Sequence, residues 1–284
     1  MRQWCRSFFI FILLLATIPA RAAATWTTID VPGAIQTVIE KINNTGQMVG
    51  SYDDSKHVTH GFLYSDGTFT TIDFPGATST DAQGINNLGD IVGGYEINAT
   101  FHRYILHGQT FTTVDVPGGL TTTVSAINDT GEIVGSYDDS QTHQNRAFVW
   151  DGSQFLTVEP TDSIFSSLNG INSQGDVVGY FVLPTLETGG YAYSQGKFTI
   201  VYFPGGYQTI FLGVNDKRKI VGCTQNPIGL AKGLAYFRGD FARIQFPGSQ
   251  STVAVGINLA GDVSGTYYHP AQVAHGFLRT SSVD

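Results

Sequence analysis

The stretch FTTIDFPGATSTDAQGINNLGDIVGGY, from Phe69 to Tyr95, decides the fold because most of it occurs again elsewhere in the chain. WTTIDVPGA begins at Trp26, and FTTVDVPGG begins at Phe111. A sequence that repeats itself at a fixed interval is typical of repeat architectures, in which each copy forms one supersecondary unit. The first question is therefore how many copies the 284 residues contain.

Three independent markers recur with the same period and define six copies. The first is an asparagine after Ile or Val, which recurs every 42 to 44 residues, at Asn43, Asn86, Asn128, Asn172, Asn215 and Asn258. The second is a glycine after Val (after Ser264 in the last copy), at Gly50, Gly93, Gly135, Gly179, Gly222 and Gly265. The third is a Pro-Gly dipeptide, which begins at Pro32, Pro75, Pro117, Pro204 and Pro247.

Each copy predicts four short strands. The segments NNLGD and NDTGE combine Asn or Asp with Gly, which suits tight turns that need positive φ. Segments such as DIVGGY and HGFLY are short and rich in β-branched or aromatic residues, and FTTID alternates at period two. No helical stretch follows residue 24. The pattern predicts an all-β, six-bladed β-propeller with four-stranded blades of about 43 residues, and an open β-solenoid is the alternative.

The ends of the repeat predict how the ring closes. The segment TWTTIDVPG is a fourth strand with nothing before it, and HGFLRTSSVD is a third strand with no fourth after it. We expect residues 25–31 to join the last blade, because this pairing leaves no open sheet edge. Residues 25–284 would then form a single propeller domain.

Residues 1–24 read as a signal peptide. Arg2 and Arg6 precede an apolar run that is shorter than the roughly 20 residues of a membrane span. The small-x-small triplet ARA then predicts cleavage after Ala22 or Ala24. We therefore expect a secreted or periplasmic protein, with no membrane association after cleavage.

The composition of the remaining chain excludes some partners. It holds 12 basic and 23 acidic residues once Arg2, Arg6 and Arg21 are removed, which argues against nucleic acid and anionic membranes. Cys223 is the one cysteine left, so a disulfide within the chain is excluded and the thiol is expected in the core. We expect a monomer whose stability comes from packing.

The motif GINNxGxIVGxY, followed by HGF or RAF and an Asp-Gly turn, resembles the HAF-type extracellular repeat found in exported bacterial proteins. The match is good at His60–Phe62 and His275–Phe277 and weaker at Arg146–Phe148, whereas copies two, four and five read FHRYI, GGYAY and KGLAY. The resemblance covers essentially the whole mature chain. It implies export and repetition, and it implies no activity.

Sequence variation is confined to one face of the predicted disc. The turns after the first and third strands are short and constant, whereas the connections after the second and fourth strands include all the variable segments. Because binding residues tend to lie on loops that a rigid scaffold carries, we expect the functional surface on this variable-loop face. Two segments there read SYDDS, with Asp53, Asp54, Asp138 and Asp139. These carboxylates suit a hard cation such as Ca²⁺, although solvated turns are the alternative and no cofactor is otherwise expected.

The innermost strands predict a polar channel. Small residues precede the Ile or Val of the asparagine marker in every copy except the first, which has Lys41. One position earlier, the residues are Glu40, Gln83, Ser125, Asn169, Leu212 and Val255. If these side chains face the channel, one side of it is polar and the other apolar, which suits a small polar ligand such as a sugar; bound water is the alternative. The candidate ligand-binding set is Glu40, Lys41, Gln83, Ser125, Asn169, Tyr52, Tyr137 and Tyr268.

Two functions remain open from the sequence. The first is an exported, non-catalytic propeller that binds a glycan or an extracellular protein through the variable-loop face. The second is a hydrolase or lyase acting on a glycan or lactone at the mouth of the channel, with Glu40 and Lys41 as the catalytic candidates. Propellers host both classes, so the fold does not decide between them.

Overall fold

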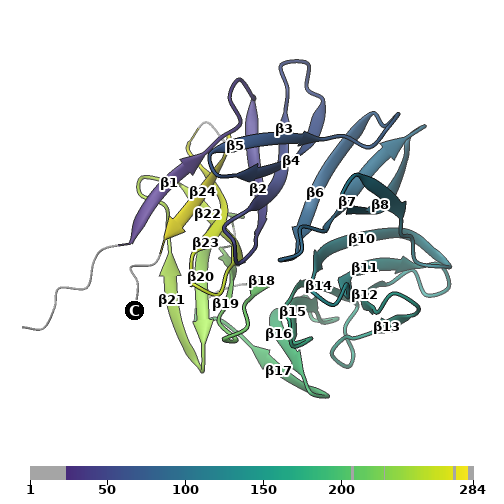
Figure 1. Ribbon diagram of the computed structural model, residues 1–284. Coiled ribbons are helices and arrows are strands. Elements are labelled where there is room, and N and C mark those ends of the chain that lie inside the picture. Colours follow the sequence, from purple (N-terminus) through teal and green to yellow (C-terminus); the bar gives the residue numbers. More distant parts are fainter. Residues whose placement is uncertain (1–23, 206–207, 227, 271–272, 281–284) are drawn as a thin grey trace, which may run out of the picture.

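The computed structural model describes residues 24–205, 208–226, 228–270 and 273–280. The predicted signal peptide lies outside these residues apart from Ala24. The described residues form strands joined by turns and contain no helix, so the prediction of an all-β protein is confirmed (Figure 1). The described part of the chain accordingly has no helix that could span a membrane.

The strands pair in six antiparallel units of four, numbered here in chain order. The first unit is β2 (Gln36–Ile42), β3 (Met48–Asp53), β4 (Thr59–Ser65) and β5 (Thr68–Ile72). The second unit is β6 (Ser79–Ile85), β7 (Ile91–Ile97), β8 (Thr100–His107) and β9 (Thr110–Thr113). The third unit is β10 (Gly119–Ile127), β11 (Ile133–Asp139), β12 (Asn145–Trp150) and β13 (Phe155–Thr157).

The last three units follow the same order. The fourth unit is β14 (Phe165–Ile171), β15 (Val177–Val182), β16 (Thr188–Ser194) and β17 (Lys197–Val201). The fifth unit is β18 (Gln208–Val214), β19 (Ile220–Gln225), β20 (Ala231–Phe237) and β21 (Asp240–Ile244). The sixth unit is β22 (Ser251–Ile257), β23 (Val263–Tyr268), β24 (Ala274–Thr280) and, from the other end of the chain, β1 (Thr25–Ile29).

The amino-terminal strand β1 pairs with β24, as the sequence predicts. The register runs antiparallel from Thr25 opposite Thr280 to Ile29 opposite Gly276. The ring of Trp26 packs against Phe277 and Phe246, with centroid distances of 5.3 and 5.6 Å. The sixth unit therefore combines the two ends of the described chain.

The units lie side by side around a common centre (Figure 1). The first strand of every unit contacts the first strand of the next unit, and β22 of the sixth unit contacts β2 of the first. Single parallel pairings, Asn145 with Phe165 and Thr188 with Gln208, also join the third, fourth and fifth units into one sheet. The first strands are thus the innermost elements.

The glycine marker is explained by packing inside each unit. A Cβ on Gly135 would lie 1.9 Å from the Thr123 carbonyl oxygen, so no other residue fits there. The equivalent glycines of the other units meet a first-strand carbonyl at 1.9 to 2.1 Å. Large side chains of the third strands are fully buried in the same cores, namely Phe62, Tyr104, Phe148, Tyr191, Leu234 and Phe277.

The small residues before the asparagine marker lie where neighbouring first strands approach most closely. A Cβ on Gly84 would be 2.8 Å from the Ala126 Cα, and one on Gly213 would be 2.5 Å from the Val255 carbonyl oxygen. The predicted crowding toward the axis is therefore present. Lys41 is the exception at this position and, unlike the glycines, brings a long charged side chain to the axis.

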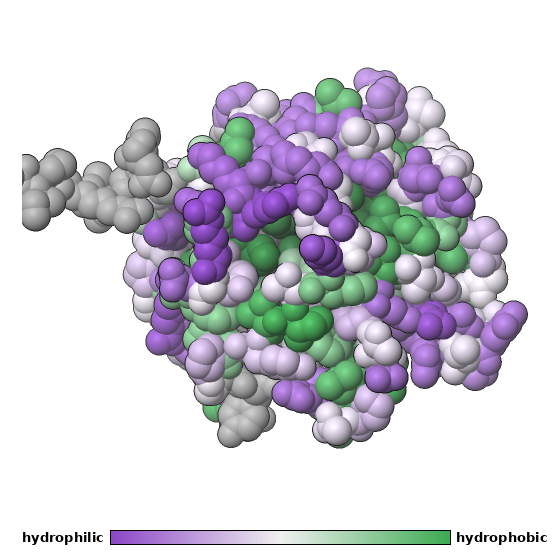
Figure 2. Space-filling model, turned by 90° about the horizontal axis from the view of Figure 1, so that it is seen from below, coloured by the Kyte–Doolittle hydropathy of each residue, from purple (hydrophilic) through white to green (hydrophobic). Residues whose placement is uncertain are grey.

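Hydrophobic side chains also reach the outside of the disc. Figure 2 shows one side of the molecule, on which green hydrophobic residues gather among purple hydrophilic ones. The exposed large hydrophobic residues include Leu156 of β13 and Phe198 and Ile200 of β17. These outermost strands are only three to five residues long, which limits the open sheet edge that they offer.

Candidate functional site

The asparagine marker forms a circle of hydrogen bonds on the face that carries the tight turns. The side-chain Nδ2 of Asn43 donates to the Asn86 carbonyl oxygen at 3.1 Å. The same bond continues around the axis, from Asn86 to Asn128, Asn128 to Asn172, Asn172 to Asn215 and Asn215 to Asn258, at 2.9 to 3.3 Å. All six asparagines are buried. These five bonds, which we call the asparagine circle, tie each unit to the next from the first to the sixth.

A second, outer circle is formed by the residues that follow these asparagines. The backbone N–H of Asn44 donates to Asn87 Oδ1, and that of Asn87 donates to Asp129 Oδ1, both at 2.8 Å. The backbone N–H of Leu259 in the sixth unit donates to Asn44 Oδ1 in the first at 2.7 Å. Together the two circles link all six units by hydrogen bonds.

The cavity between these circles is small. It has a volume of about 70 Å³ and is lined by both circles and by the preceding Ile and Val residues. A second cavity of about 60 Å³ shares that apolar ring and also touches Lys41. Ligand sites usually measure about 300 Å³ or more, so these cavities suit a few water molecules rather than a sugar ring. We therefore assign the two circles to stability.

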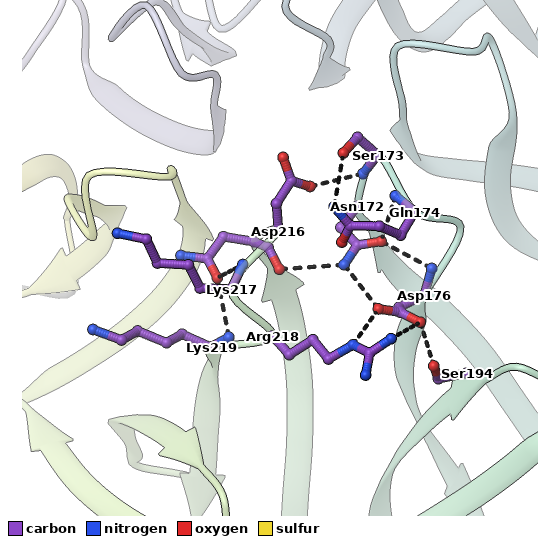
Figure 3. A network of polar contacts seen from close by, with 10 residues as sticks. Asn172, Ser173, Gln174, Asp176, Ser194, Asp216, Lys217, Arg218 and Lys219 are labelled. Atoms are coloured by element: carbon purple, nitrogen blue, oxygen red, sulfur yellow. Dashed lines mark hydrogen bonds and ion pairs between the residues drawn. The ribbon is translucent and has the colours of Figure 1, made fainter.

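One tight turn departs from the pattern. Arg218 takes the position of the turn glycine and has φ of 60°, a conformation that costs a non-glycine residue energy. Its guanidinium bonds Asp176 of the fourth unit, with Nε to Oδ2 at 2.8 Å (Figure 3). Burial alone would raise the pKa of the Asp176 carboxyl, but hydrogen bonds from Ser194, Arg218 and Asn172 outweigh it and lower the pKa. The strained turn thus gains a bond between two units.

The four aspartates predicted as cation ligands lie on the variable-loop face, where hydrogen bonds occupy them. Asp54 accepts the backbone N–H groups of Lys56 and Val58, and Asp139 accepts those of Gln141 and Thr142. Asp53 and Asp138 accept side-chain donors, which include Gln36 and Asn145 respectively. Among the residues that the structure describes, no three His, Cys, Asp or Glu side chains are grouped as a metal site would need. The four carboxylates therefore stabilise the conformation of the loops in which they lie.

Histidine–aspartate pairs recur on the same face in the sixth, first and second units, which are neighbours in space. His60 Nδ1 lies 2.8 Å from Asp73, and His102 Nδ1 lies 3.0 Å from Asp115. The third pair joins His275 to Asp30 at 2.7 Å, and the third unit replaces the pair with Arg146 and Glu159 at 2.6 Å. Each of these histidines thus bonds a carboxylate of its own unit's fourth-strand end.

Tyrosines support the histidine pairs. The ring of Tyr52 stacks on His60 with a centroid distance of 5.2 Å, and its hydroxyl bonds Thr71 at 3.1 Å. Tyr137 occupies the same position in the third unit, and its hydroxyl lies 3.5 Å from Thr157. Tyr52 and Tyr137 thus belong to the outer part of their units, apart from the channel residues with which the sequence grouped them.

The predicted channel residues share a backbone feature that the sequence did not reveal. Each lies at a β-bulge, where the first strand carries one residue more than its partner, at Glu40, Gln83, Ser125, Asn169, Leu212 and Val255. Bulges redirect side chains and are frequent beside active sites. The bulge explains why the neighbouring glycines and these residues do not continue the ordinary alternation of the strand.

The polar bulge residues do not behave alike. Asn169 is buried, and its Nδ2 donates to the Phe211 carbonyl oxygen of the next unit at 2.9 Å, so it serves packing. Glu40 and Lys41 are only partly buried. Burial raises the pKa of the Glu40 carboxyl, which Lys41 counteracts and Asp81 reinforces. Burial lowers the pKa of the Lys41 ammonium to about 8, against the attraction of Glu40.

Tyr268 joins this group from the sixth unit. Burial raises the pKa of its hydroxyl, and the charge of Glu40 adds to the shift, so the two side chains lie close. The structure therefore brings Tyr268 and Glu40 to one sector of the molecule, beside Lys41, which lines the second cavity. Ser125 is partly buried at the equivalent bulge of the third unit.

Sequence reasoning missed two residues of this sector, Asp81 and Arg103. Asp81 stands directly opposite Gly94 in the β6–β7 pairing, and Arg103 stands opposite Gly94 in the β7–β8 pairing. The signal was available, because the other units have Gly or Ala where the second has Arg103. We call Glu40, Lys41, Asp81, Gln83 and Arg103 the polar arc.

No protein-family model matches the chain, and no curated protein matches it in sequence. Solved structures are similar in fold. AofleA from Arthrobotrys oligospora has a TM-score of 0.56 at 12% identity, over 92% of this chain and 90% of that chain. A fucose-specific lectin from Aleuria aurantia has a TM-score of 0.51 at 12% identity, over 89% and 97%. Virginiamycin B lyase from Staphylococcus aureus has a TM-score of 0.50 at 11% identity, over 89% and 88%.

These similarities concern the fold alone. The β-propeller domain of the Trilobed protease from Pyrococcus furiosus is also similar, with a TM-score of 0.51 at 9% identity over 88% of this chain and 97% of that chain, which agrees with the repeated four-strand units seen here. The neighbours include both a lectin and a lyase. The choice between binding and catalysis therefore depends on the residues of this chain.

Proposed function

We propose that the protein is an exported, monomeric, six-bladed β-propeller that binds a glycan at the polar arc, which the ligand reaches from the variable-loop face, without transforming it. The units would be the blades, with the amino-terminal strand completing the sixth. The resemblance to HAF-type repeats supports export, and the lectins among the structural neighbours support glycan binding.

The polar arc is the observation that carries this proposal. Its side chains are partly exposed, they offer both hydrogen-bond donors and acceptors, and Leu212 and Val255 occupy the same bulge position in the fifth and sixth units. A glycan combines hydroxyl groups with apolar ring faces. Sites for such ligands are mostly apolar with a few placed polar groups.

A glycan array probed with the chain from Thr25 onward tests the proposal. We expect retention on a restricted set of glycans, confirmed by titration calorimetry with the best one. Gln83→Ala should weaken that binding, whereas Asn87→Ala on the tight-turn face should leave it unchanged. Failure of the wild-type chain to bind any glycan on the array would contradict the proposal.

A second function, hydrolysis or elimination at the channel mouth, is favoured by one observation. The charge of Asp81 reinforces the raised pKa of Glu40, so two carboxyl groups affect each other in this sector. Paired carboxyl groups are the usual arrangement for acid–base chemistry on glycosides. Release of reducing sugar or opening of a lactone by the wild-type chain, abolished in Glu40→Gln, would establish this alternative.

A further inference from the structure

The second unit carries three coordinated departures from the repeat. Asp81 replaces Val38, Thr123, Ser167, Ile210 and Val253 of the other units. Gly94 replaces residues with side chains, such as Ser51 and Ser136, and Arg103 replaces Gly or Ala. The three positions are cross-strand neighbours in one row, so their side chains share a face of the sheet.

The departures compensate one another sterically. A Cβ on Gly94 would lie 2.3 Å from Arg103 Nη1 and 3.2 Å from Asp81 Oδ2. The Arg103 guanidinium therefore lies above Gly94, on the side of Asp81. It fits there because Gly94 has no side chain. Arg103 Nε donates to the Thr122 carbonyl oxygen of the third unit at 2.5 Å, which fixes the guanidinium between the two units.

The two charges nevertheless do not meet. Asp81 accepts the Gly94 N–H at 2.8 Å and also lies within hydrogen-bonding reach of the Gln83 side chain, and within the described residues no hydrogen bond or ion pair joins it to Arg103. Arg103 Nη1 and Asp81 Oδ2 are the facing atoms. Since they lie 2.3 and 3.2 Å from the position of the missing Gly94 Cβ, they are at most 5.5 Å apart. Two hydrogen bonds of about 2.8 Å that meet at one oxygen would span such a gap. The gap is therefore suited to a single hydroxyl group.

The charges of the polar arc select the kind of ligand. Glu40 and Asp81 disfavour an anion, Lys41 and Arg103 disfavour a cation, and the four formal charges cancel. A neutral hydroxyl both donates and accepts, so it satisfies the carboxylate and the guanidinium together. Both side chains are partly exposed.

We propose that Asp81 and Arg103 form a glycan-specificity site, in which one sugar hydroxyl donates to Asp81 and accepts from Arg103 across Gly94. The site rests on the proposed glycan-binding function. The second unit would then recognise the sugar. The residues at the equivalent positions of the other five units would serve only the structure.

Methyl glycosides are the probes for this site. Methyl α-L-fucoside, methyl α-D-mannoside and methyl β-D-galactoside are titrated into the wild-type chain by ligand-observed NMR, with tetrahydropyran as a probe that has the ring but no hydroxyl group. The variants are Arg103→Gln, Asp81→Asn and Gly94→Ser, the last of which places in the gap the residue that the first and third units carry. Arg243→Gln, at an exposed position of β21, is the matched control.

We expect at least one glycoside to bind and the hydroxyl-free probe not to bind. Arg103→Gln and Asp81→Asn should each weaken binding at least tenfold, Gly94→Ser should do the same, and Arg243→Gln should not change it. Circular dichroism and melting temperature confirm that each variant is folded.

Two failures remain distinguishable. If glycosides bind the wild type and the folded Arg103→Gln and Asp81→Asn variants equally well, the site is overturned while the glycan-binding function stands. If the array finds glycans but none of the glycosides binds, the hydroxyl bridge is also overturned. If the wild type binds nothing on the array either, the proposed function fails and takes the site with it.

Discussion

Replacing Asn172 by Ala tests how much the asparagine circle contributes to stability. The side chain of Asn172 makes four hydrogen bonds. Its Nδ2 donates to the Asn215 carbonyl at 3.3 Å and to Asp176 Oδ2 at 3.1 Å. Its Oδ1 accepts the backbone N–H groups of Gln174 at 3.0 Å and Asp176 at 2.9 Å (Figure 3). The substitution removes all four bonds from a buried position.

The expected cost follows from these bonds. A hydrogen bond contributes about 1 kcal/mol net, and a buried group left unpaired costs about 1–3 kcal/mol. We therefore expect Asn172→Ala to lower the free energy of unfolding by about 3–5 kcal/mol. Asn44→Ala removes one bond at the exposed outer circle, to the Leu259 N–H at 2.7 Å, and should cost about 1 kcal/mol.

Urea unfolding followed by tryptophan fluorescence measures both variants against the wild type. Asn172→Asp is a useful second variant, because it keeps the oxygen that accepts two N–H groups but turns its other oxygen toward two acceptors, the Asp176 carboxylate and the Asn215 carbonyl. It should cost at least as much stability as Asn172→Ala at neutral pH. A loss below about 1 kcal/mol for Asn172→Ala would refute the assignment of the circle to stability.

Three further predictions concern packing, reactivity and pH. Gly135→Ala should destabilise the protein by at least about 2 kcal/mol in a thermal melt, because its Cβ would meet the Thr123 carbonyl oxygen; an unchanged melting temperature would contradict this packing. Burial raises the pKa of the Cys223 thiol to about 12, so a thiol reagent at pH 8 should label it only after denaturation, and rapid labelling of the native chain would place it elsewhere. Burial lowers the pKa of Lys41 from 10.5 to about 8, so the unfolded chain binds more protons between these values and the Lys41 contribution to stability should rise with pH across this window. The stability difference between wild type and Lys41→Met, followed by urea unfolding from pH 7 to 10.5, should show that rise, and a flat difference would argue against the shift.

The architecture was predictable because the repeat makes the same physical demands six times. A glycine beside a first-strand carbonyl, as at Gly135, tolerates no other residue, so the marker persists in every copy. The asparagine marker was read as turn chemistry, which is half of its role. Its Nδ2 bond to the next unit could not be read from one copy, because the acceptor lies about one repeat away in the sequence.

The candidate site was less predictable. Repeat alignment found Glu40 and Gln83 but gave no sign of the bulge, because a bulge is a mismatch with the neighbouring strand. It also grouped Tyr52 with the channel residues, although that side chain stacks on His60. Asp81 and Arg103 were not predicted, because the candidate residues were chosen at positions that recur in every copy. These two residues occur in the second copy alone.

The central claim is that six units close into one ring through β1, and a cross-link between its ends tests it most directly. Thr27 and Leu278 are directly opposite in the β1–β24 pairing. After mild oxidation, Thr27→Cys with Leu278→Cys should form an intramolecular disulfide that mass spectrometry of a tryptic digest detects. The pair Thr27→Cys with Thr280→Cys, two positions out of register, should not. A chain in which the first pair stays reduced while the protein is folded would contradict the ring.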